Sequence, residues 1–232
     1  MSGERDPAGP LAEAVVSAAV PPPCPVCSAD ALRFFMSVGS QGYWRCRRCE
    51  ATLLDPAHRL SPAQERDYYL LHRNDPDDPG YRAFLSRLAE PLLARLRAPA
   101  SGLDFGCGPG PALGPMLEAA GHRVRNYDPA FAPDETALAQ SYDFIACSEV
   151  FEHLHHPARE MALLARLLRP GGLLAVMTRF QTDDARFANW HYRRDPTHVV
   201  FFRARSFEAM AEAIGWRCEF PTANVVFLTR PG

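Results

Sequence analysis

Three alternating glycines follow a short apolar run near the middle of the chain. The stretch reads Leu103-Asp104-Phe105-Gly106-Cys107-Gly108-Pro109-Gly110. Glycine lets the backbone turn sharply and approach a ligand that a Cβ atom would block. The helix expected after this loop presents unpaired N–H groups and the positive end of its dipole. The stretch therefore predicts a strand, a loop that binds a nucleotide-like ligand, and a helix.

The spacing of the glycines distinguishes two kinds of nucleotide site. The dinucleotide fingerprint needs a glycine three positions after the second one, and Pro111 stands there. An acidic residue, Asp128, follows the glycines after the next expected strand, at residues 123–127. A carboxylate at this distance can accept hydrogen bonds from both ribose hydroxyls. The alternative role of Asp128 is that of a turn residue before Pro129.

The pattern Asp-x-Gly-x-Gly-x-Gly resembles the first motif of class I S-adenosylmethionine-dependent methyltransferases. This resemblance implies an α/β fold with a doubly wound, Rossmann-like sheet, and S-adenosyl-L-methionine (SAM) as cofactor. It also implies a set of cofactor-binding residues: Asp104, Gly106, Gly108, Gly110, Asp128 and Glu149. Asp104 is expected to brace the loop and face the methionyl amine.

Strand and helix patterns alternate from residue 102 to residue 178, as in a parallel α/β sheet. We expect a first strand over 102–105 and a helix over 112–120 that leads to the strand at 123–127. Strands over 142–147 and 173–178 follow, with a helix over 157–168 between them. A helix beginning at Ser206 and a hairpin of 217–220 with 225–229 follow. One element is missing: residues 129–143 have room only for a short helix (134–140), where the family usually has a third strand. The adenine contact is therefore unassigned.

Two carboxylates and an imidazole follow the strand at 142–147. Glu149, Glu152 and His153 would project to one side of a helical turn at this spacing. The pattern resembles the Glu-x-x-Glu-His metal site of ubiquinone-pathway O-methyltransferases and of small-RNA 3′-end 2′-O-methyltransferases. It implies a second divalent ion, with His198 (or His191) as a further ligand. The alternative is that Glu149 only lines the cofactor pocket while Glu152 and His153 cap and pack.

Methyl transfer also requires an aligned acceptor and, where the acceptor carries a proton, a base. Histidine titrates in the useful range. The candidate catalytic residues are His153, His191 and His198, which map to the edge of the sheet where strands four and five end.

Two CxxC pairs near the N-terminus predict a zinc ribbon. The pairs are Cys24-Cys27 and Cys46-Cys49, separated by eighteen residues. Each pair directs two thiolates at one ion, and the two pairs complete a closed, structural four-sulfur site. Four arginines and one aspartate give residues 24–49 a charge of +3. Zinc with four thiolates contributes −2, so the ribbon keeps about +1, which favours docking of a protein or substrate as much as of nucleic acid.

The segment 179–205 carries six arginines, three aspartates and interleaved aromatic residues. Segments after strand five often cover the substrate pocket in this fold, so we expect acceptor contacts here.

The division expected is a disordered leader (1–23), the ribbon (24–54), a connector with N-terminal helices (55–98) and the methyltransferase domain (99–232). Seven cysteines, four of them in CxxC pairs, indicate metal in a reducing compartment and a cytoplasmic protein. The net charge of −2 shows no overall bias towards polyanions, and no run of eighteen apolar residues occurs, so no membrane span is expected.

Together these features predict methyl transfer from SAM to an oxygen or nitrogen atom, on a small-molecule acceptor. An RNA methyltransferase that uses the ribbon and the 179–205 segment remains an alternative. A non-catalytic SAM-binding scaffold whose ribbon docks a protein partner is a second one.

Overall fold

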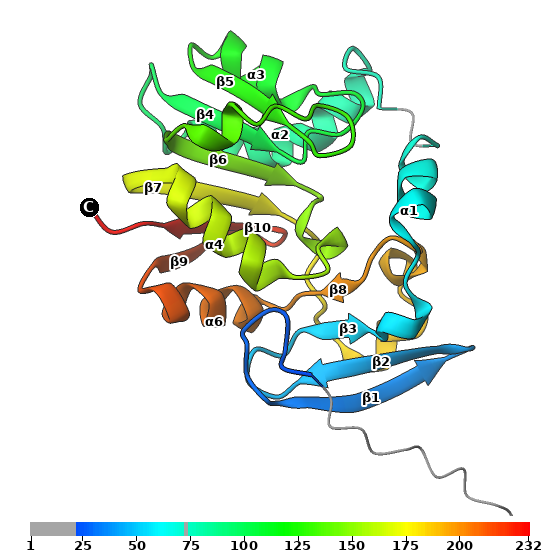
Figure 1. The fold of residues 1–232 in the computed structure, drawn as a ribbon. Helices are drawn as coiled ribbons and strands as arrows, with labels where there is room; N and C mark the ends of the chain where they lie inside the picture. The colour runs from blue at the N-terminus through cyan, green and yellow to red at the C-terminus, as the bar shows by residue number, and fades with distance from the viewer. Residues whose placement is uncertain (1–21, 72–73) are drawn as a thin grey trace, which may run out of the picture.

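The computed structural model describes residues 22–71 and 74–232, and most of the expected leader lies outside them. Its main sheet has six strands in the order β5-β4-β6-β7-β10-β9 (Figure 1). Their bounds are β4 Ser101–Phe105, β5 Arg123–Tyr127, β6 Tyr142–Ser148, β7 Leu168–Met177, β9 Arg217–Thr222 and β10 Val225–Thr229.

The sheet is parallel from β5 to β7 and ends in an antiparallel hairpin. β4 pairs in parallel with β5 and β6, and β6 pairs in parallel with β7. β10 runs antiparallel to both β7 and β9. The segment between β5 and β6 contains only the 3₁₀ turn η2 (Ala137–Ala139), so the expected absence of a third strand is confirmed. The expected helix over 134–140 is wrong, because only this single turn forms.

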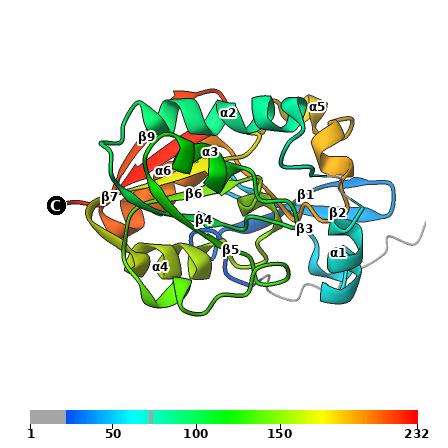
Figure 2. The same ribbon diagram turned by 90° about the horizontal axis from the view of Figure 1, so that it is seen from above.

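Helices cover both faces of the sheet (Figure 2). On one face, α2 (Pro79–Leu93) and α3 (Leu113–Ala119) pack against inward residues such as Phe144 and Ala175. On the other, α4 (Pro157–Leu167) and α6 (Ala204–Ile214) pack against alternate residues such as Ile145 and Leu174. This confirms the doubly wound α/β fold, since successive residues of one strand face opposite layers.

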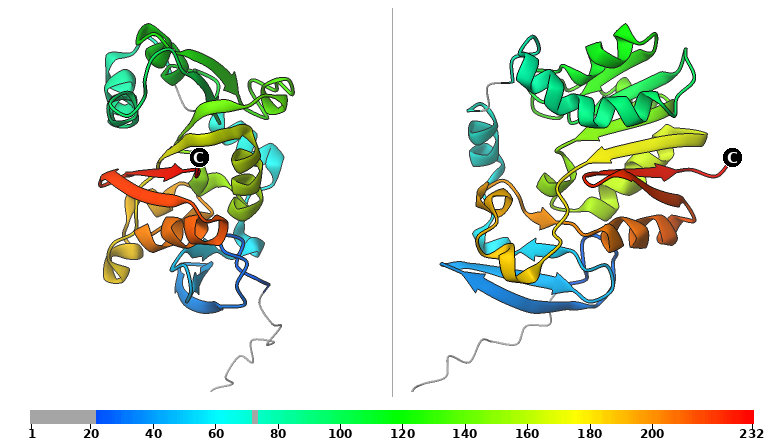
Figure 3. Two further views of the ribbon diagram at one scale, coloured as in Figure 1. Left: turned by 90° about the vertical axis from the view of Figure 1, so that its left-hand side faces the viewer. Right: turned by 180° about the vertical axis from the view of Figure 1, so that it is seen from behind.

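A second sheet lies beside the α6 end of the main sheet, with strand order β1-β2-β3-β8 (Figure 3). Its bounds are β1 Leu32–Val38, β2 Gln41–Cys46, β3 Thr52–Leu54 and β8 Val200–Phe201. The first three strands belong to the expected ribbon. The fourth comes from the segment after β7, which also holds α5 (Asp184–Phe187) and the 3₁₀ turn η4 (His191–Arg194).

The connector between the two sheets contains η1 (Pro56–His58) and α1 (Pro62–Tyr69). A capping box of Ser61 and Gln64 starts α1, which has no buried residue. In the same region, α2 continues through Pro91 as one helix. Throughout residues 22–71 and 74–232, no helix is both long and apolar enough to cross a membrane.

Some element boundaries differ from the expectations. The helix expected at Ser206 begins at Ala204, so Ser206 is the third helical residue rather than the cap. Its hydroxyl accepts a hydrogen bond from the N–H of Arg203 and donates one to the carbonyl of Cys49. α6 ends at Gly215, which has a left-handed φ of 69°.

Candidate functional site: a pocket along the ends of the parallel strands

The glycine loop turns directly after β4. Gly106 has a φ of 77°, and a Cβ atom there would lie 2.5 Å from Val150 Cγ2. A Cβ atom on Gly110 would lie 1.8 Å from the backbone oxygen of Asn74, on the loop before α2. Both positions therefore exclude any side chain: at Gly106 the backbone is left-handed, and at Gly110 another segment passes close by.

Two aspartates stand on either side of this loop. Asp104 is 3% exposed, and burial together with the nearby charge of Asp128 raises its pKa from 3.8 to about 7. Asp128 accepts hydrogen bonds from the N–H groups of Gly108 (3.1 Å), Ala130 (2.8 Å) and Phe131 (3.1 Å). Asp128 thus holds the turn after β5 and the glycine loop together, which is the turn role that the sequence left open.

One pocket of about 920 Å³ joins the two groups of expected site residues. Its lining includes Asp104, Gly106, Gly108, Asp128 and Glu149 in one part, and His153, His191 and His198 in the other. Gly110 lies outside the lining and acts instead through its contact with the loop at Asn74. The expected cofactor and acceptor residues therefore share one cavity at the carboxyl ends of the strands, where ligands bind in open α/β sheets.

The expected turn of Glu149, Glu152 and His153 has a different form in the structure. Glu149 has a φ of 52° and precedes the 3₁₀ turn η3 (Phe151–His153), so the three residues are not on one helical turn. The Tyr192 hydroxyl donates a 2.5 Å hydrogen bond to Glu152 Oε1 and lies 3.2 Å from Glu149 Oε2. Burial raises the pKa of Glu149 to about 7, and burial with the charge of Glu149 raises the pKa of Glu152 well above its ordinary value.

Glu152, His153 and His198 form a compact group. One ligand atom from each lies within 4.8 Å of the others, whereas Glu149 and His191 are outside this group. The second carboxylate oxygen of Glu152, Oε2, is buried and has no hydrogen-bond partner among the described residues. An orphaned buried carboxylate oxygen beside two imidazoles suits a divalent cation, because carboxylate and imidazole are both common ligands of such ions.

Backbone carbonyls orient the two imidazoles. Nδ1 of His153 lies 3.1 Å from the Thr197 carbonyl, and Nδ1 of His198 lies 2.7 Å from the Tyr192 carbonyl. A carbonyl accepts only, so it selects the tautomer with the proton on Nδ1 and the lone pair on Nε2. This is the second-layer arrangement usual for histidine ligands of metals.

The third histidine, His191, has a different environment. Its Nε2 lies 3.0 Å from the Arg179 guanidinium, and its ring is exposed. Because arginine only donates, Nε2 of His191 accepts this hydrogen bond. The structure therefore brings His153 and His198 together with Glu152 and leaves His191 on the rim of the pocket.

The four cysteines expected to bind zinc also converge. Their sulfur atoms lie within 4.8 Å of one another. The Cys24–Cys49 and Cys27–Cys46 sulfurs are separated by 3.7 and 3.6 Å. A tetrahedral zinc with Zn–S bonds of about 2.3 Å separates its sulfurs by about 3.8 Å, so the group fits a zinc ion.

Comparison with protein families now identifies the chain. Residues 75–219 match the family described as methyltransferase domain, which is more than half of the sequence. The chain belongs to the methyltransferase family. It is an S-adenosylmethionine-dependent enzyme with a small N-terminal cysteine cluster suited to zinc.

A solved structure supports the fold at low identity. The chain is similar to 1,6-didemethyltoxoflavin-N1-methyltransferase from Burkholderia thailandensis, with 18% identity and a TM-score of 0.52, over 87% of this chain and all of that one (100%). It also aligns with magnesium protoporphyrin IX methyltransferase from Synechocystis PCC 6803 at 15% identity and a TM-score of 0.47, over 73% of this chain and 95% of that one.

A third alignment is with CalO1, a methyltransferase in calicheamicin biosynthesis, at 14% identity and a TM-score of 0.47. It covers 66% of this chain, and the chain spans about half (55%) of the length of CalO1. No curated protein matches the sequence.

Sequence reasoning missed the role of Tyr192, which bridges both glutamates and orients His198 through its carbonyl. It appeared only as one of several aromatic residues in the 179–205 segment. No spacing rule could have found it, because its partners lie about forty positions earlier in the chain.

Proposed function

We propose that the enzyme transfers the methyl group of SAM to an oxygen or nitrogen atom of a small molecule. The observation that carries this proposal is one continuous pocket of about 920 Å³, which extends from the glycine loop to the side lined by His153, His191 and His198. Ligand pockets usually measure about 300–1,000 Å³, so this one has room for a cofactor and a small acceptor together.

In this proposal the cofactor lies on the side of the glycine loop. Besides holding the turn, Asp128 accepts a ribose hydroxyl through Oδ2, the oxygen that also accepts the Gly108 N–H. Gly106 and Gly108 allow the close approach, and Asp104 faces the methionyl amine. The sulfonium of SAM supplies an already activated methyl group. The tasks left to the protein are to align the acceptor in line with the methyl–sulfur bond and to remove its proton.

We place the acceptor against Glu152, His153 and His198, with a divalent ion between them. Such an ion would lower the pKa of an acceptor hydroxyl. Glu152 and the two imidazoles then orient the acceptor oxygen, and the proton that the acceptor loses passes to solvent at the rim of the pocket. Without an ion, His153 and His198 are themselves candidates for this base.

The RNA alternative has little support in the arginines of the 179–205 segment, because most of them are already engaged within the protein. Arg203 contacts Asp184 and Glu50, and Arg205 contacts Glu208 and Glu212. Guanidinium groups neutralised by carboxylates contribute little to phosphate binding. We further propose a reducing compartment, the cytoplasm, as the location, since four free thiols at a zinc site require one.

The test is transfer of labelled methyl from SAM into a host lysate, followed by separation of small molecules, RNA and protein. We expect label in the small-molecule fraction. The variant Glu152→Gln keeps an acceptor for Tyr192 but cannot ionise to bind a cation, so it should reduce transfer at least about tenfold while S-adenosylhomocysteine still binds. Glu118→Gln, on the exposed side of α3, is the matched control.

Each other outcome is informative. Label confined to RNA would support the alternative acceptor and contradict this proposal. Binding of S-adenosylhomocysteine with no label in any fraction would support the scaffold alternative. Unchanged methyl transfer by Glu152→Gln would show that the reaction does not need a metal ion at Glu152.

A further inference from the structure

The zinc ribbon shares a sheet with the wall of the acceptor pocket. β8 pairs antiparallel with β3, with Leu53 opposite Val200. The N–H of Leu54 donates a 2.9 Å hydrogen bond to the carbonyl of Val199, next to His198. On its other side, the N–H of Val199 donates a 2.8 Å bond to the carbonyl of Glu152. The backbone at Val199 therefore connects the ribbon directly to the candidate metal-binding group of Glu152, His153 and His198.

The cysteine loops contact the helices of the main sheet. The hydroxyl of Ser206, in the first turn of α6, donates a 2.8 Å hydrogen bond to the carbonyl of Cys49. The N–H of Ala158, in the first turn of α4, donates a 2.9 Å bond to the carbonyl of Pro25. The buried cysteines belong to the same apolar cluster as Phe151. The ribbon is thus continuous with the catalytic core.

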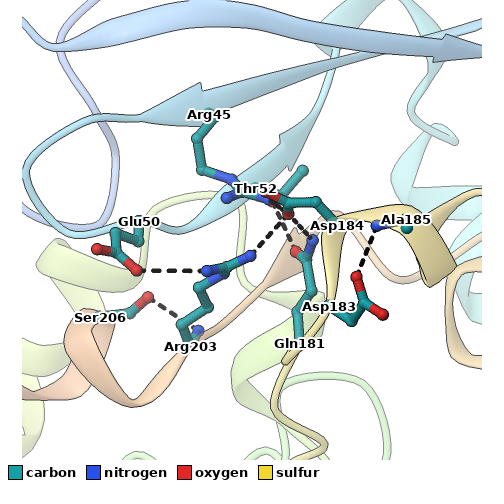
Figure 4. A network of polar contacts seen from close by, with 9 residues as sticks. All are labelled: Arg45, Glu50, Thr52, Gln181, Asp183, Asp184, Ala185, Arg203 and Ser206. Atoms are coloured by element: carbon teal, nitrogen blue, oxygen red, sulfur yellow. Dashed lines mark hydrogen bonds and ion pairs between the residues drawn. The ribbon is translucent and has the colours of Figure 1, made fainter.

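Charged and polar side chains strengthen this junction (Figure 4). Asp184 lies 2.7 Å from Arg45 of β2 and 2.7 Å from Arg203, which also lies 3.5 Å from Glu50. The hydroxyl of Thr52 in β3 donates a 2.7 Å hydrogen bond to Gln181. Both ends of the segment after β7 are therefore held by the ribbon.

One arginine joins the ribbon to the turn that carries Tyr192. Arg193 donates hydrogen bonds from one nitrogen to the Tyr43 hydroxyl (2.9 Å) and to Gln41 Oε1 (3.1 Å), both on β2. From its other terminal nitrogen it donates a 3.1 Å bond to the carbonyl of Ala188. The preceding residue, Tyr192, contacts Glu152 and orients His198. A displacement of Arg193 would therefore move both.

We propose that Arg193 is a positioning residue that fixes the acceptor wall, the side of the pocket lined by Tyr192 and His198, to the ribbon. The zinc-binding site then determines the positions of Tyr192 and His198. The ribbon then serves the reaction as part of the acceptor pocket and does not act as a separate docking module. Most of the expected cofactor contacts lie away from this link, because Gly106, Gly108 and Asp128 follow β4 and β5 at the far side of the sheet; Glu149, 3.2 Å from the Tyr192 hydroxyl, lies between the two. This role of Arg193 does not depend on which acceptor the enzyme uses.

Tryptophan resonances provide a readout that does not need the acceptor. The chain has three tryptophans. Trp190 packs on Tyr192 with ring centroids 5.1 Å apart, Trp44 lies on β2, and Trp216 follows α6. The full-length, zinc-loaded protein labelled with 5-fluorotryptophan gives one fluorine signal for each residue.

We expect Arg193→Met to move the signal of Trp190, and to leave those of Trp44 and Trp216 and the affinity for S-adenosylhomocysteine unchanged. Arg193→Lys keeps a donor for Tyr43 and should restore the signal of Trp190 in part, which loss of general stability would not do. The matched control is Arg33→Met, because Arg33 lies on β1 and, within residues 22–71 and 74–232, donates a hydrogen bond only to the carbonyl of Leu32 beside it. Removal of zinc with a chelator should displace the signal of Trp190 in the same direction.

An unmoved Trp190 signal in Arg193→Met would overturn the proposal. So would zinc removal that abolishes S-adenosylhomocysteine binding and shifts the signal of Trp216 together with that of Trp190, because the effect would then reach beyond the ribbon and the acceptor wall.

Discussion

Replacing Asp104 with asparagine should flatten the pH dependence of stability. Burial raises the pKa of Asp104 from 3.8 to about 7, so between these values the folded protein holds a proton that the unfolded chain has lost. Stability contributed by the protonated carboxyl is therefore complete at low pH and is lost as the pH rises towards 7. Asparagine keeps the shape of the carboxyl but does not titrate.

The size of the effect follows from the two pKa values. Each pH unit between them costs about 1.4 kcal/mol, and integration from pH 5 to 7.5 gives a loss of about 2.5 kcal/mol. Asp104 is only 3% exposed, so solvent screening reduces this little. Glu149 and Glu152 shift in the same direction, but they are present in both proteins and cancel in the comparison.

The assay is urea unfolding of both proteins at several pH values in this range, with zinc present throughout. We expect the stability of the wild type to fall relative to Asp104→Asn by about 2.5 kcal/mol from pH 5 to 7.5. Parallel profiles would refute the reasoning, since they would mean that Asp104 is already ionised in the folded protein. The affinity of the wild type for S-adenosylhomocysteine should rise with pH up to about 7, because only the ionised carboxyl pairs with the methionyl amine.

Two further substitutions test the glycine loop and the cysteine site. Gly110→Ala would place a Cβ atom 1.8 Å from the Asn74 oxygen and should lower the free energy of unfolding in urea by about 1–3 kcal/mol. Gly42→Ala is the control, because the nearest described atom would lie 3.7 Å from its Cβ atom, and it should lower stability little. Equal losses of stability would contradict the close packing of the two loops. Cys46→Ser should lose bound zinc and lower the unfolding temperature, whereas Cys218→Ser, outside the cysteine group, should retain both; zinc retained by Cys46→Ser would rule out the four-sulfur site.

Local signals in the sequence predicted most of the fold. The glycines at 106–110 and the strand–helix alternation up to residue 178 depend on neighbours in the chain, and the structure confirms the parallel sheet they indicate. The absence of a third strand was also predictable, because the segment between Asp128 and Tyr142 is short. Pairing over long distances was not predictable: β8 has two residues and joins a ribbon strand about 150 positions earlier.

The roles of the site residues stay predictions, and it is their arrangement that the structure describes. Glu152, His153 and His198 come together as the residue types suggested. Glu149 does not join them, because its left-handed backbone directs the chain into η3 rather than through a helical turn. Backbone conformation of this kind is set by tertiary contacts such as the bond from the Glu149 N–H to Met177, which no local pattern reveals.

The most direct test of the account is anomalous diffraction from a crystal grown with S-adenosylhomocysteine and Mn²⁺. We predict a zinc peak among the four cysteines and a manganese peak between Glu152, His153 and His198. The cofactor product should lie along the glycine loop, with its ribose at Asp128 and its sulfur facing the manganese. Density for S-adenosylhomocysteine elsewhere in the pocket would contradict the account. So would the absence of a manganese peak between Glu152, His153 and His198.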